Sequence, residues 1–200
     1  MTDFKTKYGP WALVAGASEG LGAAFAEALA RRGLNLILIA RTQDKLEQLS
    51  RHLSTSYSVE AIIYPTDLAD FNTLKTFLST RKETIGLLVY NAAYSPIGYF
   101  EDIAEESLDQ IIDVNVKTPL LLTKLLSRQM IKNKQGGIIL MSSLAGIQGS
   151  PKISTYAASK AFNTILSEGL WNELKKHGID VLASCAGAIS TPGYKKAQNT

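Results

Sequence analysis

Short apolar runs rich in β-branched residues alternate with helix-like segments along the whole chain, and this alternation constrains the fold more than any other feature. It predicts strands at 11–15, 35–40, 59–64, 85–90, 137–142 and 179–185, and helices at 20–32, 43–54, 69–80, 103–113, 114–133 and 155–177. Apolar strands separated by helices are typical of a parallel sheet covered on both faces, so the predicted class is α/β. No linker or repeat interrupts the 200 residues, which favours a single domain, 1–200.

Composition excludes several kinds of partner. The chain is 46% hydrophobic and 20% charged, and its net charge of +3 comes from scattered basic residues, so we expect no nucleic acid as partner. The longest apolar runs, such as LILIA, are too short to cross a bilayer, and MTDFKTKYGPW lacks the apolar core of a signal peptide. We therefore expect no membrane association and a cytoplasmic location.

Cysteine and histidine are scarce. Cys185 is the only cysteine, which leaves no internal disulfide and no thiolate metal cluster. His52 and His177 are the only histidines, and both fall on predicted polar helix surface. We expect neither a metal site nor a histidine-based catalytic triad.

Three glycines lie in the turn between the first strand and the first helix: Gly16, Gly20 and Gly22. Glycine permits a tight backbone bend there and lets the pyrophosphate of a dinucleotide approach the N–H groups of the helix N-terminus. The alternative is a turn that only packs helix against strand. Because a strand precedes the turn and a helix follows it, we favour dinucleotide binding.

Tyr156 and Lys160 are four residues apart on a predicted helix and therefore lie on the same face. A free tyrosine titrates near pH 10, and an adjacent ammonium group is expected to lower that pKa enough for proton transfer near neutrality. The alternative is a solvated lysine beside a half-buried packing tyrosine. Small neighbours (Ala157, Ala158, Ser159) leave room for a ligand.

The spacing Gly-x-x-x-Gly-x-Gly followed by Tyr-x-x-x-Lys resembles the short-chain dehydrogenase/reductase family. The resemblance covers nearly the whole chain and includes PTDL after the third strand, NAA after the fourth, and AGAIST after the sixth. It implies a Rossmann-like, doubly wound, three-layer fold with strand order 3-2-1-4-5-6. It also implies a seventh strand that this chain lacks, so we expect the chain to be incomplete at its C-terminus.

The resemblance also assigns site residues. The catalytic set would be Asn115, Ser143, Tyr156 and Lys160, with Ser142 a structural rival of Ser143. The cofactor-binding set would be Gly16, Ser18, Gly20, Leu21, Gly22, Arg41, Thr42, Asp67, Leu68, Asn91, Ala92, Tyr156, Lys160, Gly187, Ile189 and Thr191. Asp67 could instead cap a helix starting near residue 69. Ala93 and Ala186 depart from the family pattern, which usually has Gly and Pro there.

Pro119 lies inside the predicted helix 114–133 and has no N–H, so it cannot bond the carbonyl of Asn115. We expect a bend there and a free Asn115 carbonyl. The resemblance implies that this carbonyl holds a water linked to the lysine, as part of a proton relay. The alternative is an incidental kink with Asn115 as a buried hydrogen-bonding residue.

The resulting prediction is an oxidoreductase that interconverts a carbonyl and a secondary alcohol, with Tyr156 as general acid/base and Ser143 as donor to the substrate oxygen. The alternative is a catalytically silent dinucleotide-binding sensor or scaffold. The apolar stretch YSPIGYF (94–100) suggests a hydrophobic substrate, although surface packing would explain it equally well. A homodimer or homotetramer would form through helices 114–133 and 155–177.

The end of the second strand indicates which cofactor is used. An NAD site usually has an acidic residue there, whereas this chain has Ala40 followed by Arg41 and Thr42. Arg41 can bind a 2′-phosphate, so NADP(H) is preferred and NAD(H) remains possible. Glu19, inside the glycine turn, counts against phosphate binding.

Overall fold

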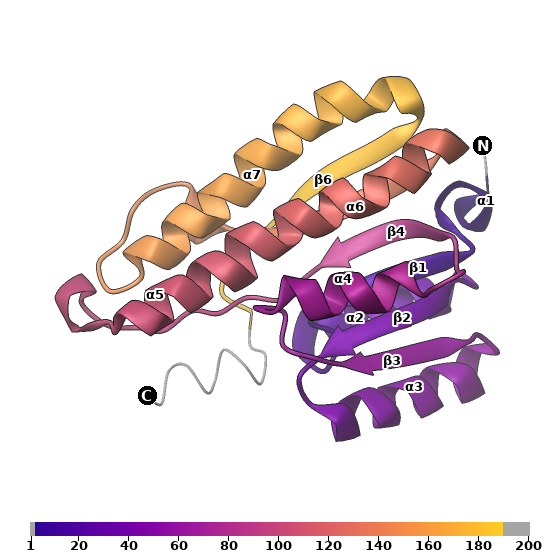
Figure 1. The fold of residues 1–200 in the computed structure, drawn as a ribbon, viewed down its shortest axis with the longest axis horizontal. Coiled ribbons are helices and arrows are strands. Elements are labelled where there is room, and N and C mark those ends of the chain that lie inside the picture. Colours follow the sequence, from indigo (N-terminus) through magenta and orange to yellow (C-terminus); the bar gives the residue numbers. More distant parts are fainter. Residues whose placement is uncertain (1–2, 190–200) are drawn as a thin grey trace.

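The computed structural model describes residues 3–189 as a six-stranded, wholly parallel sheet with helices on both faces (Figure 1). The strand order is β3-β2-β1-β4-β5-β6, which confirms the predicted doubly wound topology. The strands are β1 (Trp11–Ala15), β2 (Asn35–Ala40), β3 (Ala61–Pro65), β4 (Ile85–Tyr90), β5 (Gly136–Ser143) and β6 (Ile179–Ala186).

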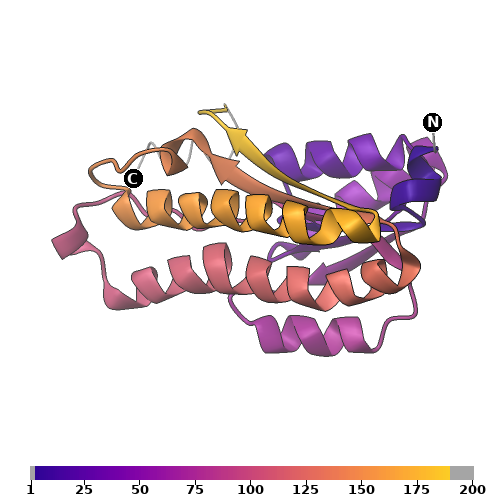
Figure 2. The same cartoon turned by 90° about the horizontal axis from the view of Figure 1, so that it is seen from above.

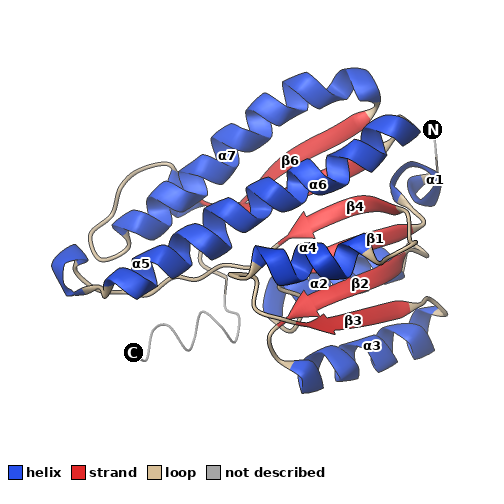
Figure 3. Cartoon of the chain, in the orientation of Figure 1, coloured by secondary structure: helices blue, strands red, loops and turns tan. Residues whose placement is uncertain are grey.

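The helices alternate with the strands as the sequence predicts (Figure 3). They are α1 (Phe4–Tyr8), α2 (Gly20–Ala30), α3 (Gln43–Tyr57), α4 (Phe71–Ser79), α5 (Glu105–Ile112), α6 (Thr118–Asn133) and α7 (Ser154–Leu174). Short 3-10 turns at Phe100–Asp102, Leu144–Gly146 and Lys175–His177 complete the chain. None of the helices in the described part is both long and apolar enough to span a bilayer.

The helix α1 was not predicted, because five residues are too few to show a helical period. Asp3 caps it by accepting a hydrogen bond from the Thr6 N–H at 3.2 Å. The Tyr8 hydroxyl donates to Asp180 in β6 at 2.5 Å, which ties the start of the chain to the far strand of the sheet.

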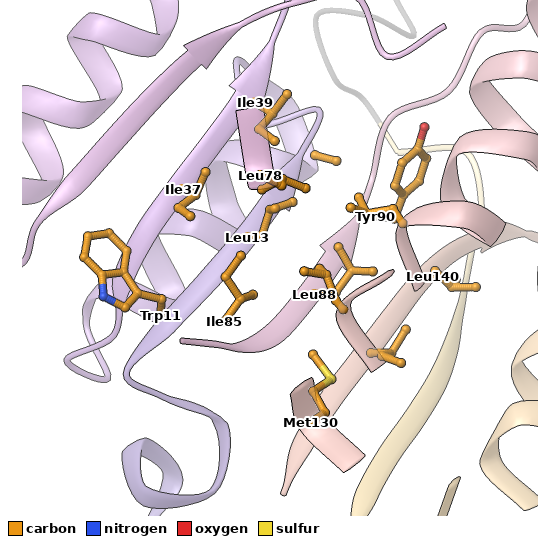
Figure 4. Packing of buried hydrophobic residues seen from close by; sticks show 14 of the residues in the cluster. Trp11, Leu13, Ile37, Ile39, Leu78, Ile85, Leu88, Tyr90, Met130 and Leu140 are labelled. Carbon is orange, nitrogen blue, oxygen red and sulfur yellow. The ribbon is translucent and has the colours of Figure 1, made fainter. Parts of the chain in front are cut away.

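Two apolar layers hold the helices on the sheet, because side chains of successive strand residues point to opposite faces. Figure 4 shows Trp11, Leu13, Ile37 and Leu88 together with Leu78 of α4 and Met130 of α6. The opposite face carries a second cluster, in which strand residues pack against α2 and α3. Figure 2 shows α4 and α6 on one side of the strands and α2 on the other.

A π-helical turn, Asp113–Lys117, joins α5 to α6. At the place where a bend caused by Pro119 was expected, the helix thus changes locally from α to π geometry. The Thr118 N–H bonds the carbonyl of Asp113, five residues back. Pro119 lies in the first turn of α6, where its missing N–H costs little. The Tyr90 hydroxyl donates to the Val114 carbonyl at 2.6 Å and fixes this turn to the end of β4.

All six strands end at one edge of the sheet, as parallel strands must. The chain order reverses between β1 and β4, and ligands of open α/β sheets bind at this switch point, beyond the carboxyl ends of the strands.

Candidate active site

A cavity of about 860 Å³ lies at the carboxyl edge of the sheet and is bordered by residues that follow each of the six strands. Its size is within the range of small-molecule and cofactor sites. Most of the predicted site residues meet there: Gly16, Ser18, Gly20, Leu21, Arg41, Thr42, Asp67, Leu68, Asn91, Ala92, Ser143, Tyr156, Lys160, Gly187 and Ile189. Gly22 and Asn115 lie behind the cavity wall, and Thr191 falls outside the described residues.

The glycine turn needs its glycines for two different reasons. Gly16 and Gly20 have φ of +82° and +58°, a backbone conformation that side chains disfavour. Gly22 is required for steric reasons, since a Cβ there would lie 1.9 Å from the Gly16 carbonyl oxygen. No side chain caps the first turn of α2, whose N-cap is Glu19, so this turn can accept an anionic group of a dinucleotide.

The end of β4 is tied to the same turn. Asn91 Nδ2 donates to the Gly16 carbonyl at 3.0 Å, and the Asn91 and Ala92 N–H groups both donate to the Ala15 carbonyl, at 2.9 and 3.0 Å. Neither Ala92 nor Ala93 has a positive φ, so alanine replaces the family's usual glycine at 93 without backbone strain. Asn91 therefore braces the glycine turn against β4.

Asp67 does not cap the helix that follows it. The N-cap of α4 is Asp70, which accepts from the Thr73 N–H at 3.0 Å, and α4 starts at Phe71 instead of residue 69. Asp67 accepts from the Ala69 N–H at 2.9 Å and faces the cavity. The helix-cap alternative for Asp67 is therefore wrong.

Tyr156, Ser143 and Lys160 occupy one side of the cavity. Burial raises the pKa of the Tyr156 phenol, and the nearby Ser143 hydroxyl opposes this shift. Lys160 Nζ donates to the Met141 carbonyl at 2.9 Å and lies 5.6 Å from the centre of the Tyr156 ring. The expectation of a lowered pKa for Tyr156 is thus wrong for this structure: burial raises that pKa, and Lys160 is not among the groups that shift it.

Burial also lowers the pKa of Lys160 to about 8. Its side chain is almost fully enclosed, and burial disfavours the charged ammonium form. At neutral pH the group still carries its proton most of the time. It can therefore give up that charge within one or two pH units of neutrality, which an exposed lysine cannot.

The two serines at the end of β5 have different environments. The Ser142 hydroxyl donates to the Lys160 carbonyl and lies within hydrogen-bond distance of Thr164 Oγ1, both at 2.7 Å, so it fastens β5 to α7. Ser143 Oγ accepts from the Ala145 N–H at 3.1 Å, and the Ser143 hydroxyl is close enough to the Tyr156 phenol to oppose the rise of its pKa. Both serines line the cavity, but the Ser142 hydroxyl is engaged with α7, which leaves Ser143 as the serine available beside the Tyr156 phenol.

Asn115 is completely buried, and its side chain holds a cavity-wall residue. Its Oδ1 accepts from the Tyr94 N–H at 2.8 Å, while its Nδ2 donates to the Tyr94 carbonyl at 2.9 Å and to Ser159 Oγ at 3.1 Å. Its main-chain carbonyl accepts from Asn163 Nδ2 at 3.1 Å. The expectation of a free carbonyl is wrong: a side chain of α7 supplies the donor that Pro119 lacks.

Charged groups surround the end of β2. Ala40 is buried, whereas Arg41 is exposed at the cavity margin with Thr42, the N-cap of α3. The Glu19 carboxylate, also on the cavity wall, forms an ion pair with Lys45 in the first turn of α3.

The opposite margin is apolar. Tyr94, Ile97, Leu144, Ile153 and Ile189 line it, and Ile97, Leu144 and Ile189 are 52%, 53% and 42% exposed. The cavity thus has a charged end beside β2 and an apolar mouth beside the 144–153 segment.

Comparison with known families agrees with this geometry. The family model described as short chain dehydrogenase matches residues 10–200. The chain belongs to the short-chain dehydrogenase family.

Curated relatives of this short-chain dehydrogenase carry different names. Hydroxysteroid dehydrogenase-like protein 1 of Gallus gallus is 35% identical over 94% of this chain and 58% of the relative. Very-long-chain 3-oxoacyl-CoA reductase of Anas platyrhynchos is 33% identical, over 94% and 64%. Inactive hydroxysteroid dehydrogenase-like protein 1 of Homo sapiens is 35% identical, over 90% and 56%. The chain therefore spans less than two thirds of the length of these relatives.

Solved structures share the fold closely. A 7beta-hydroxysteroid dehydrogenase has a TM-score of 0.91 at 31% identity, covering 98% of this chain and 76% of that one. A short-chain dehydrogenase from Sphingobium yanoikuyae, solved with NADPH, has a TM-score of 0.89 at 31% identity, covering 94% and 75%.

Three features of this short-chain dehydrogenase were not predicted. Leu144 and Ile153 line the cavity because the 3-10 turn after β5 folds beside it, and their place between a strand end and the tyrosine helix was the available signal. The Glu19–Lys45 ion pair joins residues 26 apart, which no local pattern indicates. The bond from Asn163 to Asn115 spans 48 positions.

Proposed function

We propose that this chain is the catalytic part of an NADP(H)-dependent oxidoreductase that interconverts a carbonyl and a secondary alcohol. One observation carries the proposal: Ser143, Tyr156 and the enclosed Lys160 line the same cavity as the glycine turn, with Lys160 Nζ 5.6 Å from the centre of the Tyr156 ring. When bound, the nicotinamide cofactor would supply or accept the hydride.

The protein residues would handle the proton. Burial keeps the Tyr156 phenol protonated at neutral pH, so Tyr156 can donate a proton to the substrate oxygen during reduction. The Ser143 hydroxyl would donate a hydrogen bond to the same oxygen as negative charge develops there. The Lys160 ammonium would stabilise the tyrosinate that remains. Its two other N–H donors are available for this, since one is directed at the Met141 carbonyl.

The charged end of the cavity supports a phosphorylated cofactor. Ala40 presents no carboxylate to a 2′-phosphate, and the Arg41 guanidinium lies at the cavity margin. The Sphingobium yanoikuyae relative was solved with NADPH, which supports the same preference.

The apolar mouth supports a bulky hydrophobic carbonyl substrate. Ile97, Leu144 and Ile189 offer exposed apolar surface in the lining of the cavity that also contains Tyr156. Two relatives are named for a hydroxysteroid and a very-long-chain 3-oxoacyl group, both large and apolar, so we infer that this chain accepts a ketone of that kind.

A reductase assay tests the proposal. NADPH oxidation is followed by absorbance with a panel of cyclic and long-chain ketones, for the parent and for Tyr156→Phe. We expect turnover with bulky apolar ketones that Tyr156→Phe abolishes while NADPH binding, measured by fluorescence, persists. Turnover that survives Tyr156→Phe unchanged would contradict the assigned role of Tyr156.

A second candidate is a silent dinucleotide-binding protein, favoured by the relative from Homo sapiens whose name includes the word inactive. The presence of Ser143, Tyr156 and Lys160 together supports the enzyme, since binding alone does not require all three. NADPH binding without turnover across the panel, equal in the parent and Tyr156→Phe, would favour the silent protein.

We also propose that two copies associate through α6 and α7. These helices expose Leu120, Ile165 and Trp171, and Ile165 and Trp171 are 66% and 47% exposed. Exposed apolar side chains on long helices are expected to be covered when two copies associate about a two-fold axis.

A further inference from the structure

The ion pair between Glu19 and Lys45 lies where the glycine turn meets α3. Glu19 is the N-cap of α2 and lines the cavity, and Lys45 is in the first turn of α3. Their side chains are 29% and 41% exposed, so water reaches the pair without fully surrounding it. Arg41 and Thr42, which precede α3, line the same end of the cavity.

The charges at this end require an explanation. If Arg41 binds a 2′-phosphate, the Glu19 carboxylate on the same wall would repel that phosphate. This repulsion would largely offset the attraction by Arg41. Lys45 returns one positive charge to the group. An ammonium has three N–H donors, and the bond to Glu19 uses one, so two remain for a phosphate beside Arg41.

We propose that Lys45 is the second cation of the 2′-phosphate subsite, with Glu19 as the residue that positions its ammonium against the cavity wall. The inference rests on the proposed NADP(H) function and adds a specificity-determining residue to it. Lys45 does not itself line the cavity, and the side-chain oxygen of Glu19, which a glutamine would also supply, directs its ammonium toward the cavity wall. Glu19, which counts against NADP(H) binding when only the sequence is considered, then supports that binding in the folded chain by holding Lys45 in place.

Cofactor affinity, measured without turnover, tests the proposal. Dissociation constants for NADPH and NADH, and for 2′,5′-ADP and 5′-AMP, are determined by fluorescence and calorimetry for the parent and Lys45→Met. We expect Lys45→Met to weaken NADPH and 2′,5′-ADP about tenfold, a change equal to about 1.4 kcal/mol, with little of the loss on NADH or 5′-AMP. Lys45→Arg should retain most of the affinity, because it keeps the charge.

A double-mutant cycle distinguishes direct binding of the phosphate by Lys45 from a role in which Lys45 only neutralises the charge of Glu19. If Lys45 contacts the phosphate, Lys45→Met weakens NADPH in the Glu19→Gln background as well. If Lys45 only neutralises Glu19, the substitution has no effect in that background, and the proposal is wrong. An equal loss for NADPH and NADH would also overturn it.

Arg51→Met is the matched control. It removes one positive charge from the same helix, where Arg51 is paired with Glu47 away from the cavity. NADPH affinity should stay at the parental value in this variant, and a tenfold loss there would mean that overall charge, and not Lys45, sets the preference. A parent that binds neither NADPH nor NADH would refute the proposed function itself, whereas a parent that binds NADPH regardless of Lys45 would refute this inference alone.

Discussion

Replacing Gly22 with alanine tests whether the glycine turn is as tightly packed as the structure shows. A Cβ at Gly22 would lie 1.9 Å from the Gly16 carbonyl oxygen and 2.8 Å from Asn91 Nδ2. Ordinary van der Waals separations are about 3.5 Å, well above the 1.9 Å found here. Because the oxygen belongs to the backbone, the turn itself must move by roughly 1 Å or more. That movement would stretch the bond from Asn91 to Gly16.

The magnitude follows from two opposing effects. Alanine in a helix is about 1 kcal/mol better than glycine, whereas overpacking costs about 1–3 kcal/mol and sometimes more. Because the clash is with backbone and a hydrogen bond is also strained, we expect Gly22→Ala to lower the free energy of unfolding by about 2 kcal/mol net. For a chain of this length, that corresponds to a fall in Tm of roughly 4–8 °C.

Gly169 provides the matched control. It is also helical, lies in the exposed part of α7, and a Cβ there would meet nothing within 4 Å. Gly169→Ala should therefore raise the stability by up to about 1 kcal/mol, since it gains helix propensity without a clash. Urea denaturation of both variants gives the comparison. If Gly22→Ala proves as stable as the parent, or matches Gly169→Ala, the close packing of the turn is refuted.

Three further substitutions and one pH series test other parts of the structure. Ser142→Ala should cost about 1–2 kcal/mol in urea denaturation, because it removes the bond to the Lys160 carbonyl, while Ser143→Ala should lose far less stability but about a hundredfold or more in kcat. The pKa of Lys160 is about 8 in the folded chain and 10.5 for an unperturbed lysine, so between these pH values the unfolded chain binds one proton more than the folded chain. Stability should therefore rise by up to about 3 kcal/mol between pH 8 and 10.5, relative to Lys160→Met, and an identical pH dependence in both proteins would contradict the burial of this lysine. Ile165→Glu should halve the mass seen by sedimentation equilibrium if α7 forms the dimer face, and an unchanged dimer would exclude that face.

Local sequence signals determined most of the fold. Strand bounds were predicted within two residues, because apolar runs such as LILIA end at residues with strong turn chemistry. The start of α4 was misplaced, because both Asp67 and Asp70 are suitable N-cap residues and only the geometry selects Asp70. The helix α1 was missed because its five residues are too few to show a helical period, and its bond to Asp180 is a contact that no local pattern indicates.

The site was predicted where chemistry depends on residue type at a fixed spacing, and less well where it depends on long-range contacts. The glycine turn, Tyr156 and Lys160 are recognisable by spacing, and the structure brings them to one cavity. The pKa of Tyr156 could not be predicted from spacing, because it depends on how much protein encloses the phenol. Likewise, Glu19 alone appears unfavourable for a phosphate, and only the folded chain places Lys45 beside it.

Asn115 shows how a correct local argument can lead to an incomplete conclusion. Pro119 does remove the backbone donor that would bond the Asn115 carbonyl, as the sequence indicates, but Asn163 supplies a side-chain N–H in its place. The side-chain amide of Asn115 also holds both main-chain groups of Tyr94, and Tyr94 lines the cavity. Replacing Asn115 would therefore disturb the cavity wall together with any proton path through its carbonyl. Asn163 offers the cleaner perturbation, because it contacts that carbonyl without lining the cavity.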